Sequence, residues 1–214
     1  MIYKTGSCED AMKRYGSIHA FILGGGKSLR LNHDKAFLQY KGRYFIDIVI
    51  ECCASLFGSV HLVGKHYRHP GLDGCMHDEI RGVGPLGGIL TALNSTDHEL
   101  NFFVGIDYPF IDRDIVSYLS EAALKQVEQG AQGLIPVMPD GTHPLFAFYA
   151  HSCLPAVRQC IDDGSYRVQC IAHHARIHYL DLTGDDNAPN FSAMERNFVN
   201  INDYRDFLRI TGKE

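Results

Sequence analysis

An apolar run that stops at three consecutive glycines constrains this chain more than any other feature. The run covers Ile18–Leu23, and Gly24, Gly25 and Gly26 follow it directly. An apolar run bounded by glycines is typical of a buried β-strand, and glycines let backbone N–H groups approach a ligand that side chains would keep away. The pattern therefore predicts a strand that ends in a ligand-binding loop.

The residues around this loop favour a phosphate as the ligand. Lys27, Arg30 and Lys35 lie within or just after the glycines. Cations of this kind can neutralise a polyphosphate that backbone amides orient, which indicates a bound nucleotide. The alternative is a tight turn beside a solvated basic loop.

Two familiar nucleotide loops do not fit. Gly26-Lys27-Ser28 has the end of a Walker A motif but lacks the leading glycine that the motif requires. A dinucleotide-binding loop needs a third glycine that opens a helix, and an acidic residue about 20 positions later at the end of a second strand. Here the residues from Lys27 to Lys35 are polar and irregular, and a helical pattern follows near Tyr44.

Length and composition describe an ordinary globular protein. The 214 residues are 45% hydrophobic and carry a net charge of −5, so no general basic surface is available for nucleic acid. No apolar stretch reaches the roughly 20 residues that cross a bilayer. Residues 1–16 are too polar for a signal peptide. We expect a cytoplasmic protein with an N-terminal extension over 1–16 and a single domain over 17–214.

The seven cysteines form an odd set without a Cys-x-x-Cys motif, which argues against a disulfide framework or a zinc ribbon. Cys170 with His173 and His174 offers half of a metal site, but the sequence has no second set of ligands at a suitable spacing to complete it. We expect the cysteines to be reduced and mostly buried.

Strand-like and helix-like segments alternate along the chain. Strands are predicted at 18–23, 60–63, 101–106, 133–138, 145–149 and 177–180, helices at 44–57, 87–93, 112–129, 153–161 and 166–173, and a short strand then a helix at 198–208. A mobile loop is predicted at 183–196. Helical connections between strands predict an α/β fold with a mostly parallel sheet, which binds ligands beyond the carboxyl ends of its strands.

Two acidic residues are expected at that edge of the sheet, one directly after a predicted strand and one on a loop. Asp107 comes directly after the strand at 101–106, where its carboxylate could hold Mg²⁺ together with substrate phosphates; alternatively it caps the helix near Asp112. Asp78 precedes a second glycine-rich turn at 82–88, in which Pro85 opens a helix. Asp78 could accept hydrogen bonds from a nucleobase or a ribose, or it is a solvated loop residue.

Taken together, these motifs resemble the molybdenum cofactor guanylyltransferase family. The matching segments are Ile22–Arg30, Asp34–Ala36, Gly84–Ile89, Asp107–Pro109, His143–Leu145 and Asn200–Asp203. The resemblance implies a single-domain, three-layer, Rossmann-like nucleotidyltransferase fold. It also implies transfer of GMP from GTP to molybdenum-molybdopterin with release of pyrophosphate, and delivery of the product to molybdoenzymes or carrier proteins.

The resemblance and the phosphate-loop argument predict the site residues. Lys35 and Asp107 are the expected catalytic residues, with Asp107 as the Mg²⁺ ligand. The expected nucleotide-binding residues are Leu23, Gly24, Gly25, Gly26, Lys27, Arg30, Lys35, Asp78, Gly84 and Asp107, and the expected second-substrate residues are His143, Asn200 and Asn202. The chain departs from the family pattern at Gly24, which replaces alanine, at Arg30-Leu31-Asn32, which replaces Arg-Met-Gly, and at Ile106, where cysteine is frequent.

Two other functions stay open. Motifs that bind a triphosphate do not read the base, so a related transferase could use CTP, or act on a sugar phosphate or another phosphorylated alcohol. A non-catalytic nucleotide-binding regulator is the second alternative, although it would not need both Lys35 and Asp107. The carboxylate of Asp78 favours guanine, because it accepts hydrogen bonds only and guanine presents a pair of donors.

Overall fold

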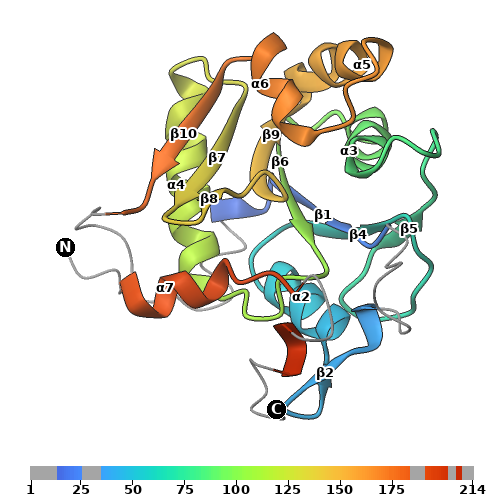
Figure 1. Cartoon of the computed structure of the whole chain (residues 1–214), viewed down its shortest axis with the longest axis vertical. Coiled ribbons are helices and arrows are strands. Elements are labelled where there is room, and N and C mark those ends of the chain that lie inside the picture. Colours follow the sequence, from blue (N-terminus) through green and yellow to red (C-terminus); the bar gives the residue numbers. More distant parts are fainter. Residues whose placement is uncertain (1–13, 26–34, 184–190, 202–205, 209–214) are drawn as a thin grey trace.

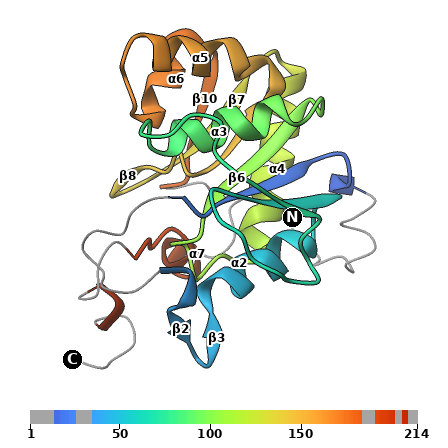
Figure 2. The same cartoon turned by 90° about the vertical axis from the view of Figure 1, so that its right-hand side faces the viewer.

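The computed structural model describes residues 14–25, 35–183, 191–201 and 206–208 (Figure 1). Its main sheet has the strand order β10-β7-β9-β6-β1-β4-β5, with β8 beside β7. The strands are β1 His19–Leu23, β4 Ser59–Val63, β5 Gly74–Met76, β6 Leu100–Gly105, β7 Gly133–Met138, β8 Gly141–Thr142, β9 Phe146–Ala150 and β10 Ile177–Asp181; β2 Gln39–Tyr40 and β3 Arg43–Tyr44 form a separate hairpin. This hairpin projects below the sheet (Figure 2).

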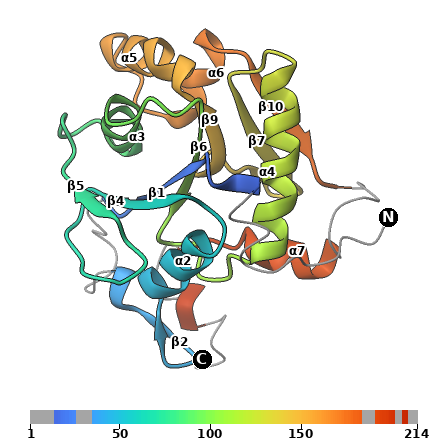
Figure 3. The same cartoon turned by 180° about the vertical axis from the view of Figure 1, so that it is seen from behind.

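The helices are α2 Phe45–Ala54, α3 Pro85–Asn94, α4 Arg113–Glu128, α5 Leu154–Asp162, α6 Ile171–His174 and α7 Phe191–Asn197, with 3₁₀ turns η1 Lys35–Phe37, η2 His151–Cys153 and η3 Val168–Cys170. Helices α2 and α4 cover one face of the sheet (Figure 3), and α3, α5 and α6 cover the other. No helix in the described part of the chain is long and apolar enough to cross a membrane.

The sheet is mixed but mostly parallel, as predicted. β1 runs parallel to both neighbours, so that Leu23 pairs with Val63 of β4 and with Gly105 of β6. The pairs β4–β5 and β7–β10 are also parallel, whereas β9 is antiparallel to β6 and β7. No crossover helix separates β7 from β9, because the chain reverses through β8 within a few residues.

Alternate side chains of β1 build two cores, one on each face of the sheet. Ala20 and Ile22 join the core beneath α2 and α4, together with Phe102. Phe21 and Leu23 join the core beneath α3 and α5. Because both faces are covered, every position of the strand except the first is buried, and the strand reads as a continuous apolar run.

Three expectations about local structure were wrong. α7 occupies residues 191–196 of the segment predicted as a mobile loop, of which 184–190 lie outside the described residues, and residues 198–201 carry no strand. The reason is burial: Met194 and Phe198 are spaced for one helix face and pack into the core on the α2 and α4 side. The helix predicted at 166–173 instead begins with η3, because Arg167 has an extended backbone.

The N-terminal extension predicted over residues 1–16 lies mostly outside the described residues. Tyr15, the penultimate residue of the predicted extension, is buried, and its hydroxyl donates to Glu121 of α4. The chain is therefore already packed against α4 before β1 begins.

Candidate functional site

The candidate site lies where neighbouring parallel strands end at glycines. Gly24 and Gly25 follow β1, and Gly64 follows β4. Gly24 N–H donates to Val63 (2.8 Å), and Gly64 N–H donates to Met76 (2.9 Å), so each loop is tied to the next strand. A Cβ on Gly64, whose φ is +80°, would lie 2.8 Å from the Cα of Gly25. Only glycine fits at that position, and the two loops touch through their backbones.

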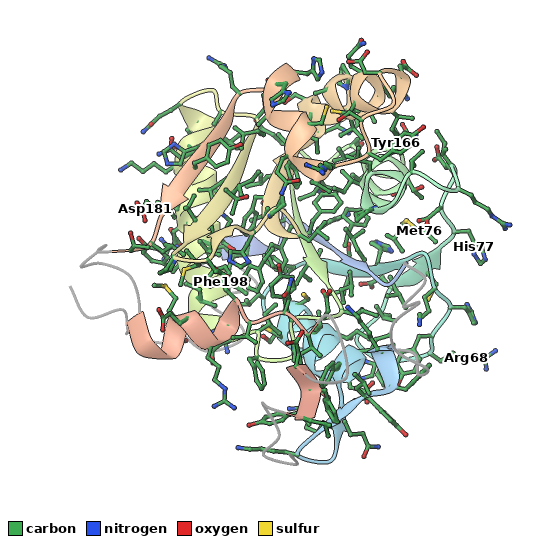
Figure 4. The ribbon with its side chains drawn as sticks, in the orientation of Figure 1. Arg68, Met76, His77, Tyr166, Asp181 and Phe198 are labelled. Atoms are coloured by element: carbon green, nitrogen blue, oxygen red, sulfur yellow. The ribbon has the colours of Figure 1, made fainter. Side chains whose placement is uncertain are left out.

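Asp78 follows β5 and reaches these same loops. A Cβ placed on Gly25 would lie 3.3 Å from Asp78 Oδ2, and one on Gly64 would lie 3.4 Å from Oδ1. Burial raises the pKa of Asp78, and His77 opposes this shift. Figure 4 shows where Met76 and His77, just before Asp78, lie at the β5 edge. Asp78 is therefore a half-buried acid at the glycine loop rather than a solvated loop residue.

Helix α3 holds the Asp78 segment in place. Thr91 Oγ1 accepts from the backbone N–H of Glu79 and donates to the carbonyl of Gly87, both at 2.9 Å. A Cβ on Gly88 would lie 3.0 Å from Leu23 Cδ2 and 3.6 Å from Asp78 Oδ1. The helix thus packs closely on the end of β1 because its first turn carries glycines.

Lys35 and Asp107 meet on the other side of β1. Asp107 follows β6, and its Oδ2 lies 3.5 Å from Lys35 Nζ; the two side chains are 22% and 17% exposed. A Cβ on Gly105 would collide with Asp107 Oδ1, so glycine lets the carboxylate fold back over the strand end. Burial raises the pKa of Asp107, opposed by Lys35 and by a backbone hydrogen bond. Asp107 does not cap α4, since Asp112 accepts from Asp114 N–H (2.7 Å) in that role.

The structure brings together most of the described candidates for nucleotide binding. Leu23, Gly24, Gly25 and Asp78 form one group at the ends of β1 and β5. Gly84 is the N-cap of α3, with a φ of +62° that favours glycine. Gly26, Lys27, Arg30 and Asn202 lie outside the described residues.

The described candidates for the second substrate belong to a polar chain beside Asp107. Tyr108, the next residue, places its hydroxyl 3.3 Å from His143 Nδ1, and His143 Nε2 lies 3.0 Å from Asp140 Oδ1. Tyr108 also shares a hydrogen bond with Asn200. The side chain of His143 is 7% exposed, and both ring nitrogens have partners within the protein. Contact between His143 or Asn200 and a second substrate stays a prediction.

Sequence reasoning missed several residues that shape this site: Gly64, Thr91, Gly105 and Tyr108. Gly64 carried a usable signal, because it follows a predicted strand in the same way as Gly24 does. Gly105 was hidden within a predicted strand. Thr91 gave no sequence signal, since its role depends on the distant Glu79 backbone.

A glycine loop at the carboxyl end of a central parallel strand, with a lysine–carboxylate pair on one side and a second carboxylate on the other, is the arrangement expected of a nucleotide-binding site in an α/β protein. The sequence pattern of the MobA-like NTP transferase domain matches residues 20–177. The chain belongs to this family and is a nucleotidyltransferase enzyme, which confirms the resemblance seen in its motifs.

Individual relatives agree with this assignment. The chain is 31% identical over 197 residues to the molybdenum cofactor guanylyltransferase of Syntrophotalea carbinolica, covering 91% of this chain and 90% of that protein. It is 26% identical over 194 residues to a probable molybdenum cofactor guanylyltransferase of Bacillus subtilis, covering 87% and 90%.

Solved structures show the same fold. The molybdopterin-guanine dinucleotide biosynthesis protein A of Archaeoglobus fulgidus superposes with a TM-score of 0.74 at 23% identity, covering 92% of this chain and all of that chain. The 2-C-methyl-D-erythritol 4-phosphate cytidylyltransferase of Thermus thermophilus gives a TM-score of 0.63 at 15% identity, covering 92% and 98%. At these identities the likeness concerns the fold, which is shared by proteins that are named for different nucleotides.

Proposed function

We propose that this enzyme transfers GMP from GTP to molybdenum-molybdopterin, in the cytoplasm, and releases pyrophosphate. The observation that carries the proposal is the Lys35–Asp107 pair beside the glycine loop, which places a cation and a carboxylate at the strand ends where a triphosphate would lie. Relatives that cover nearly the whole chain and are named for this reaction support the choice of substrates. The product passes to molybdoenzymes or to cofactor-delivery proteins.

In this reaction the terminal phosphate of the acceptor is already an oxyanion and attacks the α-phosphorus of GTP in line. A new P–O bond forms there, the bond to the bridging α,β-oxygen breaks, and pyrophosphate leaves with the electron pair. No residue has to act as a covalent nucleophile. The work of the protein is positioning and charge stabilisation: the backbone N–H of Gly25 orients the phosphates, because that of Gly24 is already bonded to Val63, and Lys35 neutralises the developing charge.

Mg²⁺ fits the donors at Asp107. The carboxylate supplies hard oxygen atoms at the edge of the sheet, and Mg²⁺ is commonly held by one or two carboxylates plus substrate phosphates. Bound there, the ion would neutralise phosphate charge and act as a Lewis acid toward the phosphoryl group. Lys35 would then exchange its Asp107 partner for a phosphate oxygen.

Asp78 is the residue proposed to select guanine. Its carboxylate reaches the glycine loop from the β5 side, opposite to Asp107, where a base attached to the bound triphosphate could be read. An ionised carboxylate accepts from both N1–H and N2–H₂ of guanine, and cytosine and adenine lack that donor pair. A base that leaves this half-buried acid unpaired is disfavoured.

Pyrophosphate release with each of the four NTPs, with and without molybdenum-loaded molybdopterin, tests the proposal. We expect release with GTP that depends on the acceptor. Equal turnover of CTP and GTP would reject the guanylyl assignment. Release that proceeds with a sugar phosphate instead of the pterin would point to a different acceptor, and nucleotide binding without turnover would indicate a regulator.

A further inference from the structure

A cluster of metal-ligating side chains lies outside the nucleotide site, between α5 and α6. One potential ligand atom from each of Cys160, Cys170 and His174 lies within 4.8 Å of the other two. The sequence suggested Cys170 with His173 and His174 as half of a site, and of the two histidines it is His174 that lies in the cluster. The fold supplies Cys160 as the third member, from a different helix.

The backbone between these residues forms a tight hairpin that holds them together. Helix α5 ends at Asp162, and the chain reverses at Gly164, whose φ is +69°. Ser165 N–H donates to the carbonyl of Cys160 (2.9 Å), which brings the returning segment back to the first ligand. Cys170 and His174 are four residues apart, and Ala175 N–H bonds the carbonyl of Ile171 (2.9 Å), so the segment between them is helical. Residues at this spacing share a helix face.

The chemistry of the three donors selects a borderline-soft divalent ion. Two thiolates and one imidazole form a donor set typical of Zn²⁺, whereas Mg²⁺ prefers oxygen donors. Asp163 Oδ2 lies 3.5 Å from His174 Nε2, so with Nδ1 as the metal ligand this carboxylate would orient the imidazole. Both thiols are buried, and the His174 side chain is 31% exposed, so a water molecule can complete the coordination at the outer edge.

We infer that Cys160, Cys170 and His174 form a zinc site that fixes α5 to α6. The site is separate from the nucleotide loop and does not depend on the proposed function. The connection between the two helices passes near the start of α3, since a Cβ on Gly84 would lie 3.8 Å from the carbonyl of Tyr166. Figure 4 shows where Tyr166 lies in this connection. Zinc would therefore stabilise the α5–α6 connection, which lies beside the N-terminus of α3.

The test uses the untagged full chain, reduced and stripped of metal with a chelator. After addition of ZnCl₂ and gel filtration, elemental analysis should find one zinc per chain. Co²⁺ in place of Zn²⁺ should give the near-ultraviolet charge-transfer absorption of cobalt–thiolate bonds. Zinc in excess should raise the melting temperature by about 5 to 10 °C, as expected for a ligand well above its Kd.

Matched variants separate this site from other cysteines and histidines. Cys160→Ser, Cys170→Ser and His174→Ala should each lower bound zinc to about a tenth or less and abolish the thermal shift. Cys153→Ser and His173→Ala are the controls and should retain both; Cys153 Sγ donates instead to the carbonyl of Gln132 (2.9 Å). His174→Ala changes a partly exposed side chain, so it tests the site even if a buried cysteine variant fails to fold.

Three results would overturn the inference. They are a wild-type chain that binds no stoichiometric zinc, cobalt binding without a thiolate band, and equal loss of zinc in the controls. If the reduced chain binds no zinc but forms a Cys160–Cys170 disulfide on mild oxidation, the two cysteines are a redox pair and not part of a metal site.

Discussion

Lys35 Nζ lies 3.5 Å from Asp107 Oδ2 and thereby joins the 3₁₀ turn η1 to the end of β6. Each charge is partly buried, and each is compensated by the other before any substrate is present. In the proposed function, a triphosphate with Mg²⁺ would supply new partners of both signs. The pair would then separate during binding at little electrostatic cost.

Replacing Asp107 should lower the turnover of the enzyme without lowering its thermal stability. Asp107→Asn keeps the shape but loses the charge, and we expect turnover to fall about 100-fold or more, because a metal-binding carboxylate stabilises the transition state. Burial raises the pKa of Asp107, so the ionised form is disfavoured in the folded chain and the neutral amide should not lower the melting temperature. Pyrophosphate-release kinetics at saturating Mg²⁺ and a thermal melt measure both effects. Wild-type turnover would remove Asp107 from the proposed metal site.

The raised pKa of Asp107 also predicts opposite pH trends for stability and for metal binding. A carboxyl whose pKa is higher in the folded state contributes stability at low pH, and this contribution is lost as the pH rises through the folded-state pKa. Mg²⁺ needs the carboxylate, so its affinity should fall as the pH drops through that same pKa. Calorimetric titration of Mg²⁺ with nucleotide over a pH series checks this. A Mg²⁺ affinity that falls only at the pH where an ordinary carboxyl group titrates would contradict this prediction.

Lys35→Ala should lower kcat/KM for GTP about tenfold to thousandfold, since Lys35 is proposed to neutralise phosphate charge in the transition state. Lys125→Ala, which removes an exposed lysine from α4, is the control and should behave as the wild type. If Lys35→Ala instead lowers only the melting temperature, Lys35 is structural.

Asp78→Ala should erode base selection more than maximal rate. We expect the preference for GTP over CTP to fall about tenfold or more, because one or two hydrogen bonds to guanine are lost. Glu79→Ala is a control on the same segment, where the side chain bonds Asn94 instead (2.8 Å). Unchanged base preference in Asp78→Ala, measured by competition between the two nucleotides, would assign base selection elsewhere.

Gly64→Ala should weaken both folding and nucleotide binding. Gly42 has the same φ of +80°, and a Cβ placed there would meet nothing within 4 Å, so Gly42→Ala carries only the backbone cost of about 1 to 2 kcal/mol. At Gly64 the added carbon also meets the backbone of Gly25, which adds overpacking of about 1 to 3 kcal/mol. Chemical denaturation and GTP titration compare the two variants. Equal effects would show that the contact with Gly25 is unimportant.

The sequence supports the order of strands and helices better than the contacts between them. Buried strands such as β6 read directly as apolar runs, and strand-then-glycine patterns mark the ends of β1 and β4. The meeting of Asp78 with Gly25 followed only from the family resemblance and not from the local pattern, because it depends on β5, a three-residue strand without an apolar run. α7 was missed because the polar residues before it dominated the local composition.

The polar chain beside Asp107 was predicted only in part. His143 and Asn200 were selected as substrate residues by resemblance, but their link through Tyr108 arises from tertiary packing. A tyrosine that follows an acidic residue carries no signal of its own. Its partners lie on two later segments of the chain, which the fold alone brings together.

The reversed direction of β9 has a consequence for how the enzyme can diversify. Because β9 is antiparallel to both β6 and β7, the strands on either side of it point the same way, and the ends of β7 and β10 open on the same edge as the glycine loop. One half of this edge, at β1, β4 and β5, is occupied by the glycines and Asp78. The other half, at the ends of β7 and β10, contains none of those glycines. In the proposed function, changes of acceptor would accumulate in this second half during evolution while the nucleotide half stays fixed.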